Sequence, residues 1–242
     1  MKQQAKIKDK GFTLIELMVA MVVAIIVIGA IYAVYQSQTR VQVAQEVTLE
    51  LQESLRAALS IMGREIRTAG ADPTGNAGAR ILRATANELW FTRNVAREFD
   101  GGPFTENTDS ANPAENIRYK VMPGQGYLGR DIEGNDNDGD LQPLLERVAG
   151  QDEESLNFVY LDSEGNRLDP PDLQTQEERN QIRQIQVTIV AESEYSDRGL
   201  LARHTDAQAY ENQKGEEIFG PANDNARRLM MTNTITCRNM PK

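Results

Sequence analysis

The segment that decides the fold reads Lys10-Gly11-Phe12-Thr13-Leu14-Ile15-Glu16-Leu17, and it joins a basic leader to a long apolar run. The run extends from Leu14 to about Tyr35, and Glu16 is its only charged residue. A helix of ~20 mostly apolar residues is long enough to cross a bilayer. The segment therefore predicts a membrane-spanning helix that begins close behind the glycine.

The charges in front of this run predict its orientation. Four lysines precede it, and they are Lys2, Lys6, Lys8 and Lys10. Lysine and arginine concentrate on the cytoplasmic side of membrane proteins. We therefore expect the N-terminus in the cytoplasm and everything after the helix on the other side of the membrane.

The order of leader, junction and apolar run differs from that of a secretory signal, in which the cleavage site follows the apolar region. Here the candidate cut lies between Gly11 and Phe12, so the apolar run is expected to stay in the mature protein. Glycine, an aromatic residue and Thr-Leu-Ile-Glu together resemble the type IV prepilin signature. In that family a membrane-embedded aspartyl peptidase cuts after the glycine and methylates the new N-terminus. By this resemblance Gly11 is the last leader residue and Phe12 the first mature one.

Glu16 lies a few residues into the predicted span, where a charged side chain costs roughly 2.5 to 3.5 kcal/mol on insertion scales. Cleavage would create an α-amino group on Phe12, and N-methylation leaves an amine that can still carry a proton. The family resemblance assigns Glu16 this amine, on a neighbouring subunit, as its partner in assembly. The alternative is a plain signal anchor, in which Glu16 lies near the lipid headgroups and has no function.

Past Tyr35 the helical pattern continues, since no proline occurs before Pro73. Apolar residues recur at three- and four-residue spacing, which indicates one apolar face. These residues are Ala44, Val47, Leu51, Leu55, Ala58, Met62 and Ile66. Gly70 followed by Asp72-Pro73 is a stop signal, so one helix is predicted from Phe12 to about Ala69.

The chain thus divides into four parts. They are the leader (1–11), the transmembrane and assembly helix (12–35), its amphipathic continuation (36–70) and an extracytoplasmic domain (71–242). In the last part, short candidate strands alternate with turn residues, as expected for an antiparallel sheet. The candidate strands are 88–93, 117–121, 156–161, 182–191 and 229–237.

The clearest candidate strand is 182–191, where Ile185, Val187 and Ile189 alternate with polar residues, which predicts one buried and one solvent-facing side. The predicted fold class is α+β and pilin-like. It has a long N-terminal helix, transmembrane in its first half, packed on an antiparallel β-sheet domain. The stretches 100–116 and 192–225 are expected to be long polar loops.

Part of the domain resembles PilW-type minor pilins and the related GspJ pseudopilins. The resemblance rests on Leu156–Tyr160, the turn Asp-Ser-Glu-Gly-Asn, and the strand Arg183–Val187. Many minor pilins carry a cysteine pair. This chain has Cys237 alone, so it forms no intrachain disulfide.

An acidic cluster, Gly134-Asn135-Asp136-Asn137-Asp138-Gly139-Asp140, offers hard oxygen ligands at alternate positions, as calcium prefers. The candidate ligands are Asp136, Asp138 and Asp140. As an EF-hand the cluster is incomplete, because alignment on Gly139 puts Leu145 where a bidentate glutamate belongs. A solvated Asn/Asp turn is the alternative interpretation.

Other features argue against nucleic-acid binding and catalysis. The formal net charge is −10, so the main domain lacks the basic surface that phosphate-backbone binding requires. His204 is the only histidine, and no serine or cysteine motif suggests a nucleophile for it. We expect no enzyme activity and, apart from calcium, no cofactor.

The combined prediction is a minor pilin that is cleaved, N-methylated and assembled into a type IV pilus, or that primes its assembly. Expected partners are other pilin subunits, major and minor, the prepilin peptidase and methyltransferase, and the inner membrane. The precursor is expected in the inner membrane with a periplasmic domain, and the mature protein in the filament. Two alternatives stay open. They are a pseudopilin of a type II secretion system, which shares the same N-terminal residues, and a signal-anchored calcium-binding module or enzyme.

Overall fold

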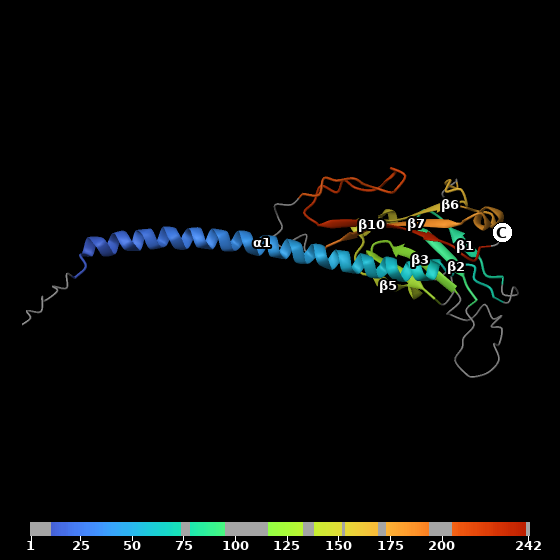
Figure 1. Ribbon diagram of the computed structural model, residues 1–242, viewed down its shortest axis with the longest axis horizontal. Helices are drawn as coiled ribbons and strands as arrows, with labels where there is room; N and C mark the ends of the chain where they lie inside the picture. The colour runs from blue at the N-terminus through green and yellow to red at the C-terminus, as the bar shows by residue number, and fades with distance from the viewer. Residues whose placement is uncertain are drawn as a thin grey trace, which may run out of the picture. The chain divides into compact units, whose positions relative to one another are not determined.

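The computed structural model describes residues 11–73, 78–94, 116–132, 138–151, 153–168, 173–193 and 205–240 (Figure 1). The chain divides into two compact units, Met1–Gln45 and Glu46–Lys242, and helix α1 (Leu14–Ile66) supplies residues to both. In the first unit, the large apolar side chains from Leu14 to Tyr35 are all exposed. This stretch of α1 is long and apolar enough to cross a membrane.

The C-terminal half of α1 forms one wall of the domain core. Its buried residues are Val47, Leu51, Leu55, Ala58, Leu59, Met62, Gly63 and Ile66. They include every apolar position expected from the sequence except Ala44, which is half-buried. Beyond Ile66 the chain turns at Gly70, whose φ of +71° favours glycine because a Cβ is disfavoured there. The helix thus ends close to the predicted stop.

In its described residues the domain contains two antiparallel sheets and a small hairpin (Figure 1). The first sheet is a meander of β1 (Ile81–Ala84), β2 (Glu88–Thr92), β3 (Asn116–Met122), β4 (Tyr127–Asp131) and β5 (Gln142–Leu145). The second has the order β10 (Arg228–Thr236), β7 (Gln184–Glu192), β6 (Leu156–Leu161). The hairpin is β8 (Tyr210–Glu211) and β9 (Glu217–Phe219). A short helix, α2 (Gln176–Asn180), and the 3-10 turns η1 (Asp138–Asp140), η2 (Ala149–Gln151) and η3 (Glu153–Ser155) complete the described elements.

The five-stranded sheet has an apolar face and a charged face, because side chains alternate along each strand. Leu89 and Phe91 on β2 lie opposite Tyr119 and Ile117 on β3, and all four are buried. This face meets α1, as shown by the bonds that Tyr119 and Arg130 make to Glu65 of the helix. The other face carries Glu88, Trp90, Arg118 and Lys120.

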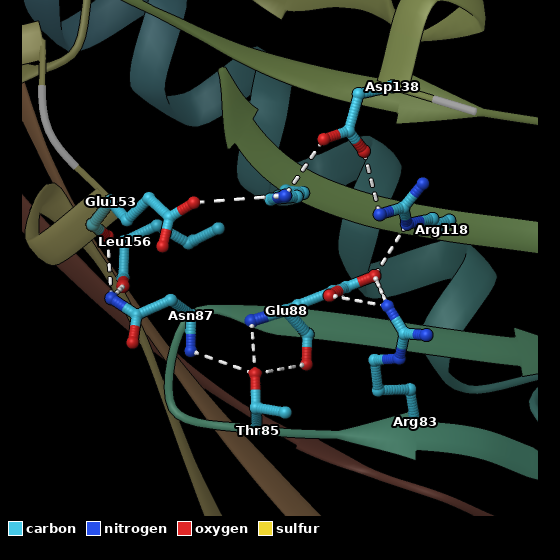
Figure 2. Close-up of polar contacts among 9 residues, drawn as sticks. Arg83, Thr85, Asn87, Glu88, Arg118, Asp138, Glu153 and Leu156 are labelled. Atoms are coloured by element: carbon cyan, nitrogen blue, oxygen red, sulfur yellow. Dashed lines mark hydrogen bonds and ion pairs between the residues drawn. The ribbon is translucent and has the colours of Figure 1, made fainter. Parts of the chain in front are cut away.

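The β1–β2 turn joins the two sheets. The Phe158 N–H on β6 donates to the Ala86 carbonyl at 2.7 Å, and the Tyr160 hydroxyl donates to the Thr85 carbonyl at 2.8 Å. The Asn87 side-chain amide donates to the carbonyls of Glu153 (2.7 Å) and Leu156 (3.2 Å), as Figure 2 shows. These bonds satisfy backbone oxygens that burial would otherwise leave without a partner.

Strand β7 contradicts the expectation of one solvent-facing side, and that prediction was wrong. Gln186 and Thr188, on the side expected to face water, are only 9% and 1% exposed. Val190, on the same side, packs with Tyr210 and Ile218 of the β8–β9 hairpin. The stretch 192–225, expected to be a polar loop, thus contains the hairpin that covers this side of the strand.

Candidate functional site

The predicted processing junction lies just before α1. Gly11 and Phe12 belong to no helix or strand, and the Phe12 side chain is 90% exposed. Among the described residues other than its chain neighbours, none has an atom within 4 Å of the position that a Cβ on Gly11 would take. The chain itself therefore sets no steric limit on residue 11, and any requirement for glycine there would come from the enzyme that cuts the chain.

Glu16 and Thr13 form a reciprocal cap at the start of α1. The Thr13 backbone N–H and hydroxyl donate to Glu16 Oε2 at 2.8 and 2.9 Å, and the Glu16 N–H donates to Thr13 Oγ1 at 3.3 Å. This is a capping box, which satisfies N–H groups that a helix start otherwise leaves without partners. The Thr-x-x-Glu spacing is the sequence signal of this box, and it was not among the predicted features of the helix start. Within the described residues no hydrogen bond reaches Glu16 Oε1.

Of the candidate calcium ligands, the structure describes the side chain of Asp138 alone. Asp136 and the side chain of Asp140 lie outside the described residues. Asp138 lies 2.8 Å from Arg118 Nη2 and 3.0 Å from Lys120 Nζ (Figure 2). Burial alone raises the pKa of Asp138, but the bonds and charges of Lys120 and Arg118 outweigh it and hold this pKa below its usual value. A calcium ion would have to compete with these two cations for the carboxylate.

The charged face of the five-stranded sheet is a network of ion pairs. Glu88 accepts hydrogen bonds from Arg83 at 3.1 Å and from Arg118 at 2.5 Å, and it lies between the two arginines in Figure 2. Trp90 carries both guanidinium groups near its ring, at 5.6 and 5.9 Å from the centroid. Because the Arg118 side chain is only 3% exposed, carboxylate partners are needed to stabilise its charge. We interpret the network as structural.

Cys237 adds no reactive group to the described part of the chain. Cys237 is buried and forms no disulfide, and burial raises the pKa of its thiol to about 12. A thiol with such a pKa stays protonated at neutral pH and is a poor nucleophile. His204 lies outside the described residues.

Comparisons with known proteins point to the N-terminal segment and to the fold. Residues 6–32 match the family described as the prokaryotic N-terminal methylation motif. The structure resembles a type IV-like pilin from Thermus thermophilus with a TM-score of 0.51 and 14% sequence identity, over 80% of this chain and 100% of that chain. At this identity the likeness establishes the fold. Among curated proteins, none matches the chain.

The chain has a pilin-like fold and carries the prokaryotic N-terminal methylation motif at its N-terminal end. The motif covers Gly11, Phe12 and Glu16, and it extends into the exposed apolar part of α1. The motif and the apolar helix together indicate a membrane-anchored precursor.

Proposed function

We propose that this pilin-like protein is a minor pilin, cut after Gly11, N-methylated on Phe12, and assembled into a type IV pilus or used to prime one. The observation that carries the proposal is the methylation motif at the head of a helix whose apolar side chains are all exposed from Leu14 to Tyr35. A continuous apolar surface of this kind needs a cover. Lipid covers it in the precursor, and the helices of other subunits cover it in the filament.

In this proposal Glu16 has two partners in succession. In the precursor, its Oε2 closes the capping box with Thr13. After cleavage and assembly, Oε1 accepts a hydrogen bond from the methylated, protonated amine of Phe12 in a neighbouring subunit. An ion pair in a nonpolar environment is favourable only when its geometry is good. The pair therefore stabilises the one relative position of the two subunits in which the amine and the carboxylate are in contact.

The experiment is mass spectrometry of the protein purified from native cells. The expected mature N-terminus is N-methylated Phe12, and a Gly11→Glu variant should keep the leader and run as the larger precursor on a gel. Recovery of the native chain still beginning at Met1, with its function intact, would contradict the proposal. The Gly11→Glu variant places a large charged side chain at a position with open space around it, so the folding of the protein should be unaffected.

A pseudopilin of a type II secretion system has the same kind of N-terminus, and the proposal for a minor pilin draws its support from the resemblance of Leu156–Tyr160 and Arg183–Val187 to PilW-type proteins. Deletion of the gene separates the two. We expect loss or reduction of surface pili with secretion intact, whereas loss of protein secretion with normal pili would favour the pseudopilin. A calcium site formed by Asp136, Asp138 and Asp140 stays a prediction.

A further inference from the structure

Arg228, the first residue of β10, is surrounded by three carboxylates. Its side chain is 2% exposed. Nη2 lies 2.6 Å from Glu192 Oε2, and Nη1 lies 3.0 Å from Asp206 Oδ2 and 2.7 Å from Asp224 Oδ1. A second bond, 2.7 Å long, joins Nη2 to Asp224 Oδ2. The guanidinium thus contacts the end of β7 and two points on the chain between β7 and β10.

Asp206 and Asp224 form the base of a closed loop. The Asp206 N–H donates to the Asp224 carbonyl at 2.8 Å, and the Asn223 N–H donates to the Asp206 carbonyl at 2.7 Å. The chain therefore leaves and returns at one point, and we call residues 206–224 the 206–224 loop. The loop contains the β8–β9 hairpin and precedes β10 in the sequence. It is coloured orange to red in Figure 1.

The loop packs a small apolar cluster of its own against the second sheet. Tyr210 and Ile218 are buried with Val190 of β7 and Ala149 of η2, and Phe219 packs against them. The same Phe219 ring lies 5.2 Å from the Arg228 guanidinium, and the Tyr210 hydroxyl donates to Asp206 Oδ2 at 3.2 Å. Arg228 thus touches both the base of the loop and its apolar cluster.

The charges at the base make the loop depend on this one cation. Three carboxylates meet at a single guanidinium, which cannot lose its proton in a protein. Without the cation, the buried Asp206 and the half-exposed Asp224 of the loop would repel the largely buried Glu192 of β7. No disulfide can hold the loop closed, because Cys237 is the only cysteine.

We propose that Arg228 is an ionic clasp that closes the 206–224 loop over β7, and that the loop opens as one unit, separately from the rest of the domain, when the clasp is removed. Other contacts hold the hairpin further out, among them the ion pair of Arg167 with Glu216, the Asn212–Asn157 hydrogen bond and the Thr234–Gln213 hydrogen bond. These contacts link the hairpin to the β6 region and to β10. At the base, two backbone hydrogen bonds join residues 206 and 223–224, and the Arg228 side chain binds all three carboxylates. Local opening of a unit with few buried contacts is a common property of folded domains.

The test is hydrogen–deuterium exchange with mass spectrometry on the full chain in detergent micelles, comparing the wild type with Arg228→Met and Arg167→Met. In Arg228→Met, amides of the loop should exchange at least about tenfold faster, while those of β2 and β3 stay within about twofold. Arg167→Met removes a more exposed ion pair and should change exchange by less than about threefold, near Glu216 only. Unchanged exchange in the loop, or an equal rise across the whole domain, would overturn the clasp.

Two further variants separate charge from packing. In Arg228→Met combined with Asp206→Asn and Asp224→Asn, the repulsion is relieved, and the loop should recover much of its protection. Failure to recover would assign the effect to packing and refute the ionic clasp. If Arg228→Met does not fold, Asp224→Asn serves instead. It removes one half-exposed carboxylate and should speed exchange a few-fold in the loop alone, and no change there would count against the proposal.

Discussion

Arg130 on β4 and Glu65 in the last turn of α1 form a two-pronged ion pair, with Nε 2.9 Å from Oε2 and Nη2 2.5 Å from Oε1. The Tyr119 hydroxyl donates to the same carboxylate. Tyr119 and Arg130 are partners on neighbouring strands, on the face of the five-stranded sheet that meets the helix. Paired Arg–carboxylate bonds are directional, so they fix how the helix is placed on the sheet.

Glu65→Gln should lower the free energy of unfolding by about 3 kcal/mol, because it leaves the largely buried Arg130 without its carboxylate. Urea unfolding followed by the fluorescence of Trp90, the only tryptophan, measures this. The control is Glu53→Gln, an exposed position on the same helix, which should stay within about 0.5 kcal/mol of the wild type. Equal stability of the two variants would show that the ion pair contributes nothing.

The same carboxylate should make stability depend on acidity. Burial by itself raises the pKa of Glu65, but the hydrogen bonds from Arg130 and Tyr119 outweigh it, so the pKa lies below its ordinary value of 4.5. A depressed pKa in the folded state stabilises the protein above the ordinary pKa, and this stabilisation is lost as the pH falls through the folded-state pKa. The free energy of unfolding should therefore fall below about pH 4.5, and less steeply in Glu65→Gln. Parallel curves for the two proteins would contradict this assignment.

Two substitutions separate the capping role of Glu16 from its charge. Glutamine can replace glutamate in a capping box, so Glu16→Gln keeps the helix start and loses only the anion. Thr13→Ala keeps the anion and loses the cap, at a cost of about 1 kcal/mol. We expect both variants to be cleaved, Thr13→Ala to enter filaments, and Glu16→Gln to be excluded. Normal incorporation of Glu16→Gln, measured by immunoblot of sheared filaments, would argue against a role for the charge.

Calcium binding at the acidic cluster can be tested by calorimetry on the purified chain. If the prediction holds, millimolar calcium should release heat, and Asp138→Asn should weaken the binding because it removes one ligand. Asp162→Asn, in an exposed turn elsewhere, is the matched control and should bind as the wild type does. Absence of heat in the wild type would remove the calcium prediction.

Cys237 should resist modification in the folded protein. Burial keeps its thiol protonated and out of contact with solvent, so a maleimide should label it only after unfolding. Labelling and unfolding should follow the same urea dependence. Fast labelling of the native chain would place the thiol at the surface.

Features that depend on local pattern could be predicted from the amino-acid sequence alone. The Gly11 to Glu16 motif, the apolar run, the amphipathic spacing up to Ile66 and the strand Leu156–Leu161 could all be read along the chain, because the helical period and strand alternation are local properties. The strands β1, β4 and β5 were missed. They are short and carry polar residues, so they have little periodicity of their own and depend on their partners in the sheet. β1 pairs with β2, β4 with β3, and β5 with β4.

Which polar residues are buried, and with which partners, became known from the packing of the folded chain. The second side of β7 reads as solvent-facing along the chain, yet the β8–β9 hairpin covers it. Glu65 forms an ion pair with Arg130, and Arg228 forms one with Asp206. The partners are far apart in the sequence, so no local pattern predicts these pairs. A buried charged side chain is stable only when folding places an oppositely charged partner beside it. Which residue becomes that partner depends on the tertiary packing of the whole domain.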